Sequence, residues 1–573
     1  MKTTPLRSAA WMDGDDEVAM SHRVAMRIAE ADRGKPIIGI ADTASVLNPC
    51  NFGFTALLPE IERGIRDGGG IPARFPVMSL GEDLMKPSAM LYRNLVAMEL
   101  EETIRANPLD GVVYLANCDK SVPASLLAAA STDLPSLLLL GGARSAPLFR
   151  GKPLGSGTDL WRALDERRAG QLDDGEWADL ERKLACTGPG SCNTMGTAST
   201  MAILTEVLGM CLPGVAGLSA LGDELRRAAY DTGLAVTAAV IDGRRPSERM
   251  MQPAMDNAIR VLGAIGGSTN AIIHLAAVAG RLGLDASLDR MDGLWRDIPL
   301  LADIEPCGTG LIFDFRAAGG VATLADALGT RFDRAPLAGD GRDWFHVIAE
   351  APAPNGVIHH FDDPVLPAPT LAAVFGSLAP DGAVIKIAAA TEELLQHTGH
   401  AIVFDDYADM RKRLDDQSIA VTADDVIVVR NCGPVGVPGM PEWGMAPIPQ
   451  RLIEQGVRDM VRISDGRMSG TSFGTVVLHI APESAIGGPL ALVRDGDRIE
   501  LDIAGRSLNL LVTAEELAQR SANLTKRIQP HLRGWPAMYQ RHVQQAPTGA
   551  DLDFLVAPTA TSRTFIEPVV GRS

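Results

Sequence analysis

Residues 110–123 read D-G-V-V-Y-L-A-N-C-D-K-S-V-P, and this stretch carries the main signal for the fold. Its first half is a short apolar run with β-branched and aromatic residues, which is typical of a buried strand. Its second half places a thiol, a carboxylate and an amine together as Cys118, Asp119 and Lys120. A helix is expected to start near Ala124. The stretch therefore predicts a strand that delivers reactive side chains to one edge of a sheet.

The segments on either side repeat the pattern of strand followed by helix. Apolar runs at 35–42 and 134–142 read as further strands, and helical spacing occurs at about 55–70 and 88–105. This alternation predicts an α/β domain with a parallel sheet covered by helices. Ligands of such sheets bind at the carboxyl ends of the strands. A polar, charged segment at about 143–186 reads as an excursion from the sheet.

The pattern changes in the last third of the chain. A Pro-rich stretch at about 351–380 reads as a linker. Short apolar runs follow it, separated by turn signals such as R-D-G-D, and they predict a β-rich second domain. We therefore expect an N-terminal α/β domain over residues 1–379 and a C-terminal β-rich domain over residues 380–573.

Composition and charge argue against several classes of protein. The chain has 573 residues, of which 46% are hydrophobic and 22% charged, as in ordinary globular proteins. Its net charge of −18 argues against binding to nucleic acid or to an anionic membrane surface. The N-terminus turns acidic early, and no apolar run approaches the ~20 residues of a membrane helix. We therefore expect neither a signal peptide nor a membrane span.

The seven cysteines are sparse and show no short-range pairing pattern. This usage favours reduced thiols and a cytoplasmic location over a disulfide framework. Cys50, Cys118 and Cys192 follow polar or Gly/Pro loop residues, which makes them candidate metal ligands, although free cysteines are also common as small buried residues. The remaining four are weaker candidates: Cys186, Cys211, Cys307 and Cys432.

Acidic residues in loops form a second candidate group. Glu82 follows a strand-like run, Asp119 adjoins the thiol of the opening stretch, and Glu442 lies in a Gly/Pro-rich loop. Such oxygen ligands suit Mg²⁺, although surface solvation is the simpler explanation for any one of them taken alone. Lys120 would oppose a bound cation unless it is modified. It either pairs with a neighbouring acid or becomes a carboxylate by carbamylation with CO₂.

The stretch 463–474, I-S-D-G-R-M-S-G-T-S-F-G, follows a strand and is rich in Ser, Thr and Gly. It reads either as a capped turn or as an anion-holding loop with a hydroxyl base, Ser469. A serine base needs a strongly lowered pKa, which a nearby metal or dipole would have to provide. His274 is expected to be a satisfied helix residue. The Gly-rich segment 155–161, G-S-G-T-D-L-W, fits neither a dinucleotide site nor an ATP site.

Eight motifs in order along the chain resemble the dihydroxy-acid dehydratase and sugar-acid dehydratase superfamily. The resemblance runs from about residue 36 to about residue 560, and so many motifs in one order are highly specific. The motifs are N-P-C-N, P-V-M-S-L-G-E, N-C-D-K-S-V-P, G-S-C-N-T-M-G-T-A-S-T-M, G-G-S-T-N-A, P-D-G-A-V-I-K, N-C-G-P-V-G-V-P-G-M-P-E and S-D-G-R-M-S-G-T-S-F-G.

The resemblance implies an N-terminal α/β domain and a C-terminal β-barrel-like domain, with the active site between them in a homodimer or homotetramer. It implies an iron–sulfur cluster on Cys50, Cys118 and Cys192. It also implies Mg²⁺ on a second set of residues: Glu82, Asp119, carbamylated Lys120 and Glu442. Ser469 matches the family's proposed base, and Thr471 lies nearby as a substrate contact.

The implied reaction is the dehydration of a sugar acid to the 2-keto-3-deoxy acid. The C2 proton is removed and the C3 hydroxyl is lost on the iron–sulfur cluster, which acts as a Lewis acid and transfers no electron. The segments L-Y-R-N-L-V-A-M-E-L-E-E-T-I-R and R-G-K-P-L-G-S-G-T-D-L-W look more like the pentonate/hexonate branch, which is generally associated with [2Fe–2S]. The three-cysteine pattern does not itself separate this cluster from [4Fe–4S].

Two alternatives remain at this point. The first is a dihydroxy-acid dehydratase of branched-chain amino-acid biosynthesis or a phosphorylated-gluconate dehydratase. The second is a non-catalytic iron–sulfur or metal-sensing protein, but a sensor has no need of the hydroxyl base Ser469. One departure from the family concerns the stretch after Cys50, which lacks the His that many relatives carry there. This departure bears on local substrate contacts and not on the thiolate.

Overall fold

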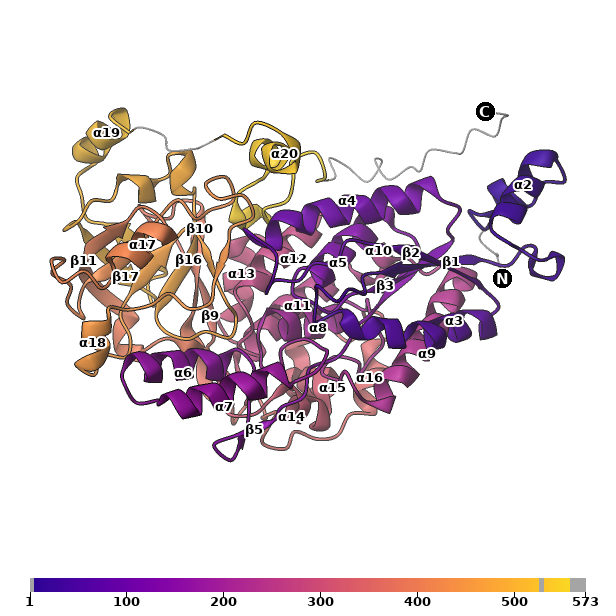
Figure 1. Ribbon diagram of the computed structural model, residues 1–573, viewed down its shortest axis with the longest axis horizontal. Coiled ribbons are helices and arrows are strands. Elements are labelled where there is room, and N and C mark those ends of the chain that lie inside the picture. Colours follow the sequence, from indigo (N-terminus) through magenta and orange to yellow (C-terminus); the bar gives the residue numbers. More distant parts are fainter. Residues whose placement is uncertain (1–4, 525–529, 557–573) are drawn as a thin grey trace.

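The computed structural model describes residues 5–524 and 530–556, and two sheets organise it (Figure 1). The first sheet has four parallel strands in the order β2-β1-β3-β4. They are β1 (Ile37–Asp42), β2 (Ile71–Pro76), β3 (Gly111–Leu115) and β4 (Ser136–Leu139). All residues of β1, β3 and β4 are buried, as expected where helices cover both faces of a parallel sheet. The predicted α/β domain is confirmed.

Helices connect these strands as the sequence pattern predicts. They are α3 (Leu58–Asp67), α4 (Met90–Ala106) and α5 (Ser121–Thr132). Helix α5 begins slightly earlier than expected, and Pro123 lies in its first turn, where a missing N–H does no harm. It is buried almost throughout because α4 and α12 (Asn270–Leu282) pack against it. A buried helix therefore starts directly after Lys120 and holds that end of β3 in place.

The second sheet has eight strands and nearly closes into a barrel. Its order is β18-β17-β11-β12-β14-β16-β10-β9. The strands are β9 (Leu371–Val374), β10 (Gly382–Lys386), β11 (Gln396–Phe404), β12 (Val426–Val429), β14 (Arg462–Ser464), β16 (Val476–Ala481), β17 (Arg498–Asp502) and β18 (Ser507–Leu510). Phe375 forms a bridge with Ser507, which brings the two edge strands together. The predicted barrel-like second domain is confirmed.

The interpretation of 351–380 as a linker was wrong for its second half. Strand β8 (Leu366–Pro369) pairs with β7 (Pro299–Leu300), and β9 is an edge strand of the barrel. Proline is tolerated in edge strands, so a Pro-rich stretch does not exclude them. The proposed division between residues 379 and 380 stays a prediction.

The polar excursion and the last described part of the chain both lie against other elements (Figure 1). The excursion forms α6 (Thr158–Arg168) and α7 (Asp174–Ala185), and α6 contacts α18 (Gln450–Glu454) of the C-terminal half. Near the C-terminus, α20 (Gly534–His542) returns to α4, and the indole of Trp535 donates to Leu91 O at 2.8 Å. No helix in the described part of the chain is long and apolar enough to cross a membrane.

Candidate active site

Loops at the carboxyl ends of three parallel strands carry all the predicted ligands of the N-terminal half except Cys192. Cys50 follows β1, Glu82 follows β2, and residues 118–120 follow β3. Because neighbouring parallel strands end at the same edge of a sheet, these loops meet there. The sheet therefore gathers residues that are far apart in the sequence.

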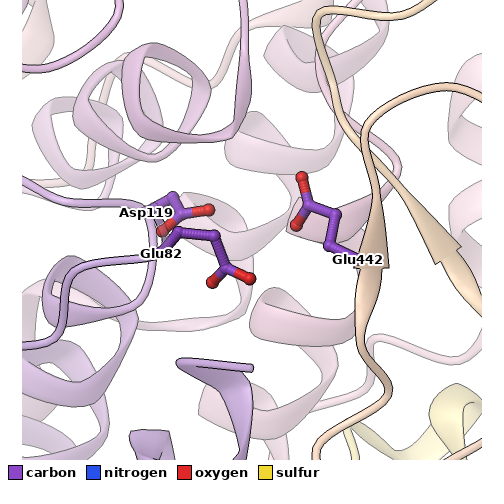
Figure 2. Close-up of side chains that lie close together, drawn as sticks. All are labelled: Glu82, Asp119 and Glu442. Carbon is purple, nitrogen blue, oxygen red and sulfur yellow. The ribbon is translucent and has the colours of Figure 1, made fainter. Parts of the chain in front are cut away.

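The C-terminal half supplies the opposite side of the site. Two short strands, β13 (Glu442–Trp443) and β15 (Arg467–Met468), pair in parallel and place Glu442 beside Arg467. Figure 2 shows the carboxylates of Glu82 and Asp119 on one side and that of Glu442 on the other, pointing toward one another. The candidate site thus lies between the two halves of the chain, as the resemblance implied.

Glu82, Asp119 and Glu442 form a compact set of carboxylates. One oxygen from each lies within 4.8 Å of the others, and no other group of three or more such ligand atoms within residues 5–524 and 530–556 is this close. The ammonium of Lys120 lies among them, with Nζ 2.7 Å from Asp119 Oδ2, 3.3 Å from Glu82 Oε2 and 3.4 Å from Glu442 Oε2. Three acids and one amine therefore share a single small space.

Burial and charge work against each other in this space. Burial by itself would lower the pKa of Lys120, but the surrounding carboxylates outweigh it and raise that pKa. Burial also raises the pKa of Glu442 to about 7, although Lys120 and Arg467 oppose the shift. The guanidinium of Arg467 lies 2.7 Å from Glu442 Oε2. The neighbouring cations, Lys120 and Arg467, thus offset the repulsion between the acids.

Two residues of the site were missed by sequence reasoning. Arg467 has a completely buried side chain and bonds Met440 O and Ser88 Oγ in addition to Glu442. Asn270 starts α12 and donates to Glu442 Oε2 at 3.0 Å and to Met468 O at 3.2 Å. Both lie inside motifs quoted for the family resemblance, S-D-G-R-M-S-G and G-G-S-T-N-A, and this position was the available signal.

The structure brings the three predicted thiols together next to the acids. A hydrogen bond between the thiols of Cys118 and Cys50 raises the Cys118 pKa, as does burial. Burial raises the pKa of Cys192 to about 11, with Arg144 opposing it and Cys50 adding to it. The Arg144 guanidinium lies 3.8 Å from Cys50 Sγ. Soft sulfur ligands and hard oxygen ligands are therefore neighbours, and Cys118 Sγ lies 3.4 Å from Asp119 Oδ1.

The other four cysteines have different surroundings. Cys211 packs in the hydrophobic core, Cys186 is exposed, and Cys432 bonds Arg430 O. Cys307 lies beside Gly266 and the buried amine of Lys386. His274 is fully buried with Nδ1 3.0 Å from Arg93 Nη1.

Ser469 and Thr471 lie in the loop that follows β15. Ser469 is partly exposed, and its Oγ is 2.9 Å from Thr471 Oγ1 and 3.3 Å from Thr471 N. Asn270 links this loop to the acids, because its amide contacts both Glu442 and the carbonyl of the residue before Ser469. Behind the loop, Lys386 Nζ lies 3.3 Å from Gly470 O. The Ser469 loop is thus linked through Asn270 to the acids, and the acids adjoin the thiols at Cys118.

Comparison of the sequence with known protein families shows the family to which the chain belongs. The model for the dihydroxy-acid/6-phosphogluconate dehydratase N-terminal region matches residues 35–340, and the model for the C-terminal region matches residues 356–550. The chain belongs to the dihydroxy-acid/6-phosphogluconate dehydratase family. Dehydratases are hydro-lyases, so the reaction class of the family is the elimination of water.

Curated relatives of this dehydratase family align over nearly the whole chain. A 6-deoxy-6-sulfo-D-gluconate dehydratase of Pseudomonas putida is 43% identical, with 98% of each chain covered. An L-arabinonate dehydratase of Rhizobium leguminosarum bv. trifolii is 41% identical, with 96% of each chain covered. A dihydroxy-acid dehydratase of Geobacter sp. is 37% identical, covering 92% of this chain and 97% of its own. The two sugar-acid dehydratases are thus more similar to this chain than the Geobacter enzyme.

Proposed function

We propose that this protein dehydrates a sugar acid, a pentonate or hexonate, to the 2-keto-3-deoxy acid. The observation that carries the proposal is the compact set of Glu82, Asp119 and Glu442 beside three gathered thiols. The identity to relatives named for arabinonate and sulfogluconate supports a sugar acid over a branched-chain substrate.

The donor atoms of the acidic set fit a hard divalent cation. Mg²⁺ prefers carboxylate oxygens and keeps room for water and substrate in its shell. Glu82, Asp119 and Glu442 offer oxygens within 4.8 Å of one another, and we propose that they hold Mg²⁺ together with a modified Lys120. An ammonium at this position would repel the metal, whereas a carbamate formed with CO₂ would become a further oxygen ligand. Mass analysis of the native protein should show a CO₂ adduct on Lys120 that acid removes.

The three thiols fit an iron–sulfur cluster for a similar reason. Thiolates are the usual ligands of such clusters, and Arg144 places a cation beside two of them. We propose that Cys50, Cys118 and Cys192 hold the cluster, in the [2Fe–2S] form. Three protein ligands leave one iron without a fourth, which suits a Lewis-acid role. Absence of iron and of visible absorbance in an anaerobic preparation would contradict this part of the proposal.

In the proposed mechanism Ser469 is the base that takes the C2 proton. Ser469 is partly exposed, Asn270 links its loop to Glu442, and Thr471 N and Thr471 Oγ1 lie within reach to donate to an alkoxide. When bound, Mg²⁺ would acidify the C2 hydrogen and the cluster would supply a Lewis acid for the leaving hydroxyl. The enol that remains after loss of water becomes the 2-keto acid by tautomerisation.

A substrate panel tests the proposed function. The protein is purified anaerobically, supplied with Mg²⁺ and incubated with pentonates, hexonates, 6-phosphogluconate and 2,3-dihydroxyisovalerate, and 2-keto acid is measured. We expect turnover of at least one unphosphorylated sugar acid. Turnover of 2,3-dihydroxyisovalerate alone, or of 6-phosphogluconate alone, would assign the chain to another branch of the family. No turnover by protein with full iron content would favour a sensor.

We further propose a cytoplasmic homodimer or homotetramer. Large apolar side chains on the loops after β1 and β2 are exposed, among them Val46, Leu47 and Leu84 at 78%, 69% and 60%. These loops also carry Cys50 and Glu82, so a second copy covering them would shield the site from water. Light scattering coupled to size-exclusion chromatography should give a mass of two or four chains, and a monomer would contradict the proposal.

A further inference from the structure

The Gly-rich segment G-S-G-T-D-L-W lies against the loop that carries Ser469. The segment ends in the first turn of α6, where the indole Nε1 of Trp161 donates to Thr471 Oγ1 at 2.9 Å. The hydroxyl of Thr158 donates to Thr471 O at 3.1 Å. The excursion therefore forms hydrogen bonds with both the side chain and the backbone of Thr471.

Small residues make this close approach possible. A Cβ on Gly157 or Gly196 would lie 2.8 Å from side-chain atoms of Thr471, and Gly157 has a positive φ of 95°. A Cβ on Gly444, close to Glu442 in the sequence, would lie 2.2 Å from the ring of Trp161. Glycines on three different segments therefore leave room for one indole and one threonine side chain.

The direction of the hydrogen bonds follows from the chemistry of the donors. An indole N–H can only donate, so Thr471 Oγ1 accepts from Trp161 and keeps its own hydrogen for another partner. Ser469 Oγ lies 2.9 Å from Thr471 Oγ1, and as an alkoxide it could only accept. The backbone N–H of Thr471 points at the same oxygen from 3.3 Å. The alkoxide would thus receive two hydrogen bonds from one residue.

We propose that Trp161 and Thr471 are positioning residues for Ser469: the indole donates to the Thr471 hydroxyl, which donates to Ser469 Oγ and stabilises its alkoxide. This inference rests on the proposed function, in which Ser469 is the base. It assigns a role to the segment 155–161, which matches no phosphate-binding motif. It also changes the role expected for Thr471 from a substrate contact to a hydrogen-bond donor for the base.

Charged groups near the loop remain unchanged in the variants that test this inference. Lys386 lies behind Gly470 O with the Cys307 thiol beside it. Across Asn270 lie Glu442 and its partners Arg467 and Lys120. Since none of these groups is substituted, a change in the pH profile between variants reports on the hydrogen bonds to Ser469.

The first test is the pH profile of kcat/KM for Trp161→Phe, which keeps an aromatic ring but lacks the N–H. We expect kcat to fall about threefold to tenfold and the acidic limb to move up by about half to one pH unit, because the base loses part of its stabilisation. Thr471→Val should move the limb further and Thr471→Ser should restore it. The control Trp177→Phe alters another indole of the excursion, stacked on Arg167, and should leave the profile unchanged.

The double variant, Trp161→Phe with Thr471→Val, tests whether Trp161 affects Ser469 through the Thr471 hydroxyl. If Trp161 works through the Thr471 hydroxyl, Trp161→Phe adds nothing to the limb shift of Thr471→Val. Additive shifts, or a Thr471→Val variant with a raised KM and an unmoved limb, would overturn the inference and restore Thr471 as a substrate contact.

A second readout needs no substrate. With nitrogen-15-labelled tryptophan, the indole signal assigned by its loss in Trp161→Phe should shift in Thr471→Val and return in Thr471→Ser. An unmoved signal would overturn the hydrogen-bond chain even if the proposed function held. Conversely, absence of sugar-acid turnover in the wild type would overturn the proposed function and the catalytic role of these hydrogen bonds. The indole signal would still report whether the hydrogen bond between Trp161 and Thr471 exists.

Discussion

Lys120 occupies the position between three carboxylates where a divalent cation would otherwise balance their charge. Its Nζ lies within 3.4 Å of an oxygen of Glu82, of Asp119 and of Glu442. This contact offsets the repulsion between three acids that are largely shielded from solvent. It also shows that the ammonium form and a bound cation exclude each other, which is the physical reason for proposing carbamylation.

Substitution Glu442→Gln should weaken Mg²⁺ binding without affecting the cluster. The variant keeps the side-chain volume but removes one of three charges, so we expect the Mg²⁺ concentration for half-maximal activity to rise at least about tenfold. Iron content should stay at the wild-type level. Glu454→Gln, on the exposed end of α18, is the matched control and should not change the Mg²⁺ requirement. An unchanged Mg²⁺ titration in Glu442→Gln would remove Glu442 from the ligand set.

Substitution Lys386→Met should lower the activity of the protein without lowering its stability. The Lys386 amine is buried, burial lowers its pKa, and no carboxylate in the described part of the chain forms an ion pair with it. Replacing it by an apolar side chain of similar length should leave the thermal midpoint unchanged or higher. Activity should fall about tenfold, because the Gly470 carbonyl next to Ser469 loses its donor. Full activity in Lys386→Met would show that the loop needs no such support.

At the scale of elements, the part of the site made by the parallel sheet could be predicted and the part made by the barrel could not. Cys118, Asp119 and Lys120 are adjacent in the sequence and follow a clear strand signal. The pairing of Glu442 with Arg467 depends on two strands of two residues each, which leave no periodicity to read. Contacts between distant segments of this kind follow from tertiary packing alone.

The N-terminal excursion gives a second example. Its departure from the sheet was predicted from charge and polarity, but its docking against the Ser469 loop was not, because Trp161 and Thr471 are far apart in the sequence and meet only in the folded chain. The interpretation of 351–380 as a linker was wrong for a different reason. Its proline content was read as a break between domains, although the stretch includes β9, an edge strand of the barrel. Local pattern therefore predicted the elements well and their mutual contacts poorly.

Helix α8 (Thr197–Val207) offers a test of pH dependence at the element scale. Its Glu206 accepts hydrogen bonds from Gly214 N and Ala216 N at 2.8 and 3.0 Å, and burial raises its pKa from 4.5 to about 7. The folded chain therefore holds this proton more tightly than the unfolded chain. The resulting stability is fully present below about pH 4.5 and is lost as the pH rises through about 7.

Glu206→Gln should remove this contribution to the pH dependence. Between about pH 4.5 and 7 the free energy of unfolding of the wild type should fall by about 3 kcal/mol more than that of the variant, because glutamine stays neutral. Denaturant titrations across this range measure the difference. Glu181→Gln, at an exposed position of α7, should keep the wild-type slope. Parallel curves for the wild type and Glu206→Gln would contradict the raised pKa.

At the scale of the whole molecule, the end of the described chain ties the two halves together. Asp551 and Arg281 form a fully buried ion pair with Nε 2.8 Å from Oδ2, and Arg93 donates to Gly549 O at 2.8 Å. Arg281 lies on α12, the helix that begins at Asn270 in the site. The C-terminal segment is therefore linked to the element that contacts Glu442.

Asp551→Asn should destabilise the protein strongly, because it removes the nearest counter-charge of the buried Arg281 guanidinium and leaves only Glu101, whose Oε2 lies 3.8 Å from Nη1. We expect a loss of about 3–5 kcal/mol in the free energy of unfolding. Asp297→Asn breaks a largely exposed pair with Arg331 and should cost less than about 1 kcal/mol. Similar losses in the two variants would show that the buried pair has no special structural role.

The most direct test of the central claim compares wild type and Ser469→Ala on the sugar-acid panel at equal iron and Mg²⁺ content. We expect the wild type to form a 2-keto-3-deoxy acid and the variant to lose at least about a hundredfold in kcat, since a general base contributes about 10²–10⁴. Cluster absorbance should be the same in both proteins. Equal turnover of a sugar acid by the two proteins, or no turnover by a fully loaded wild type, would contradict the claim.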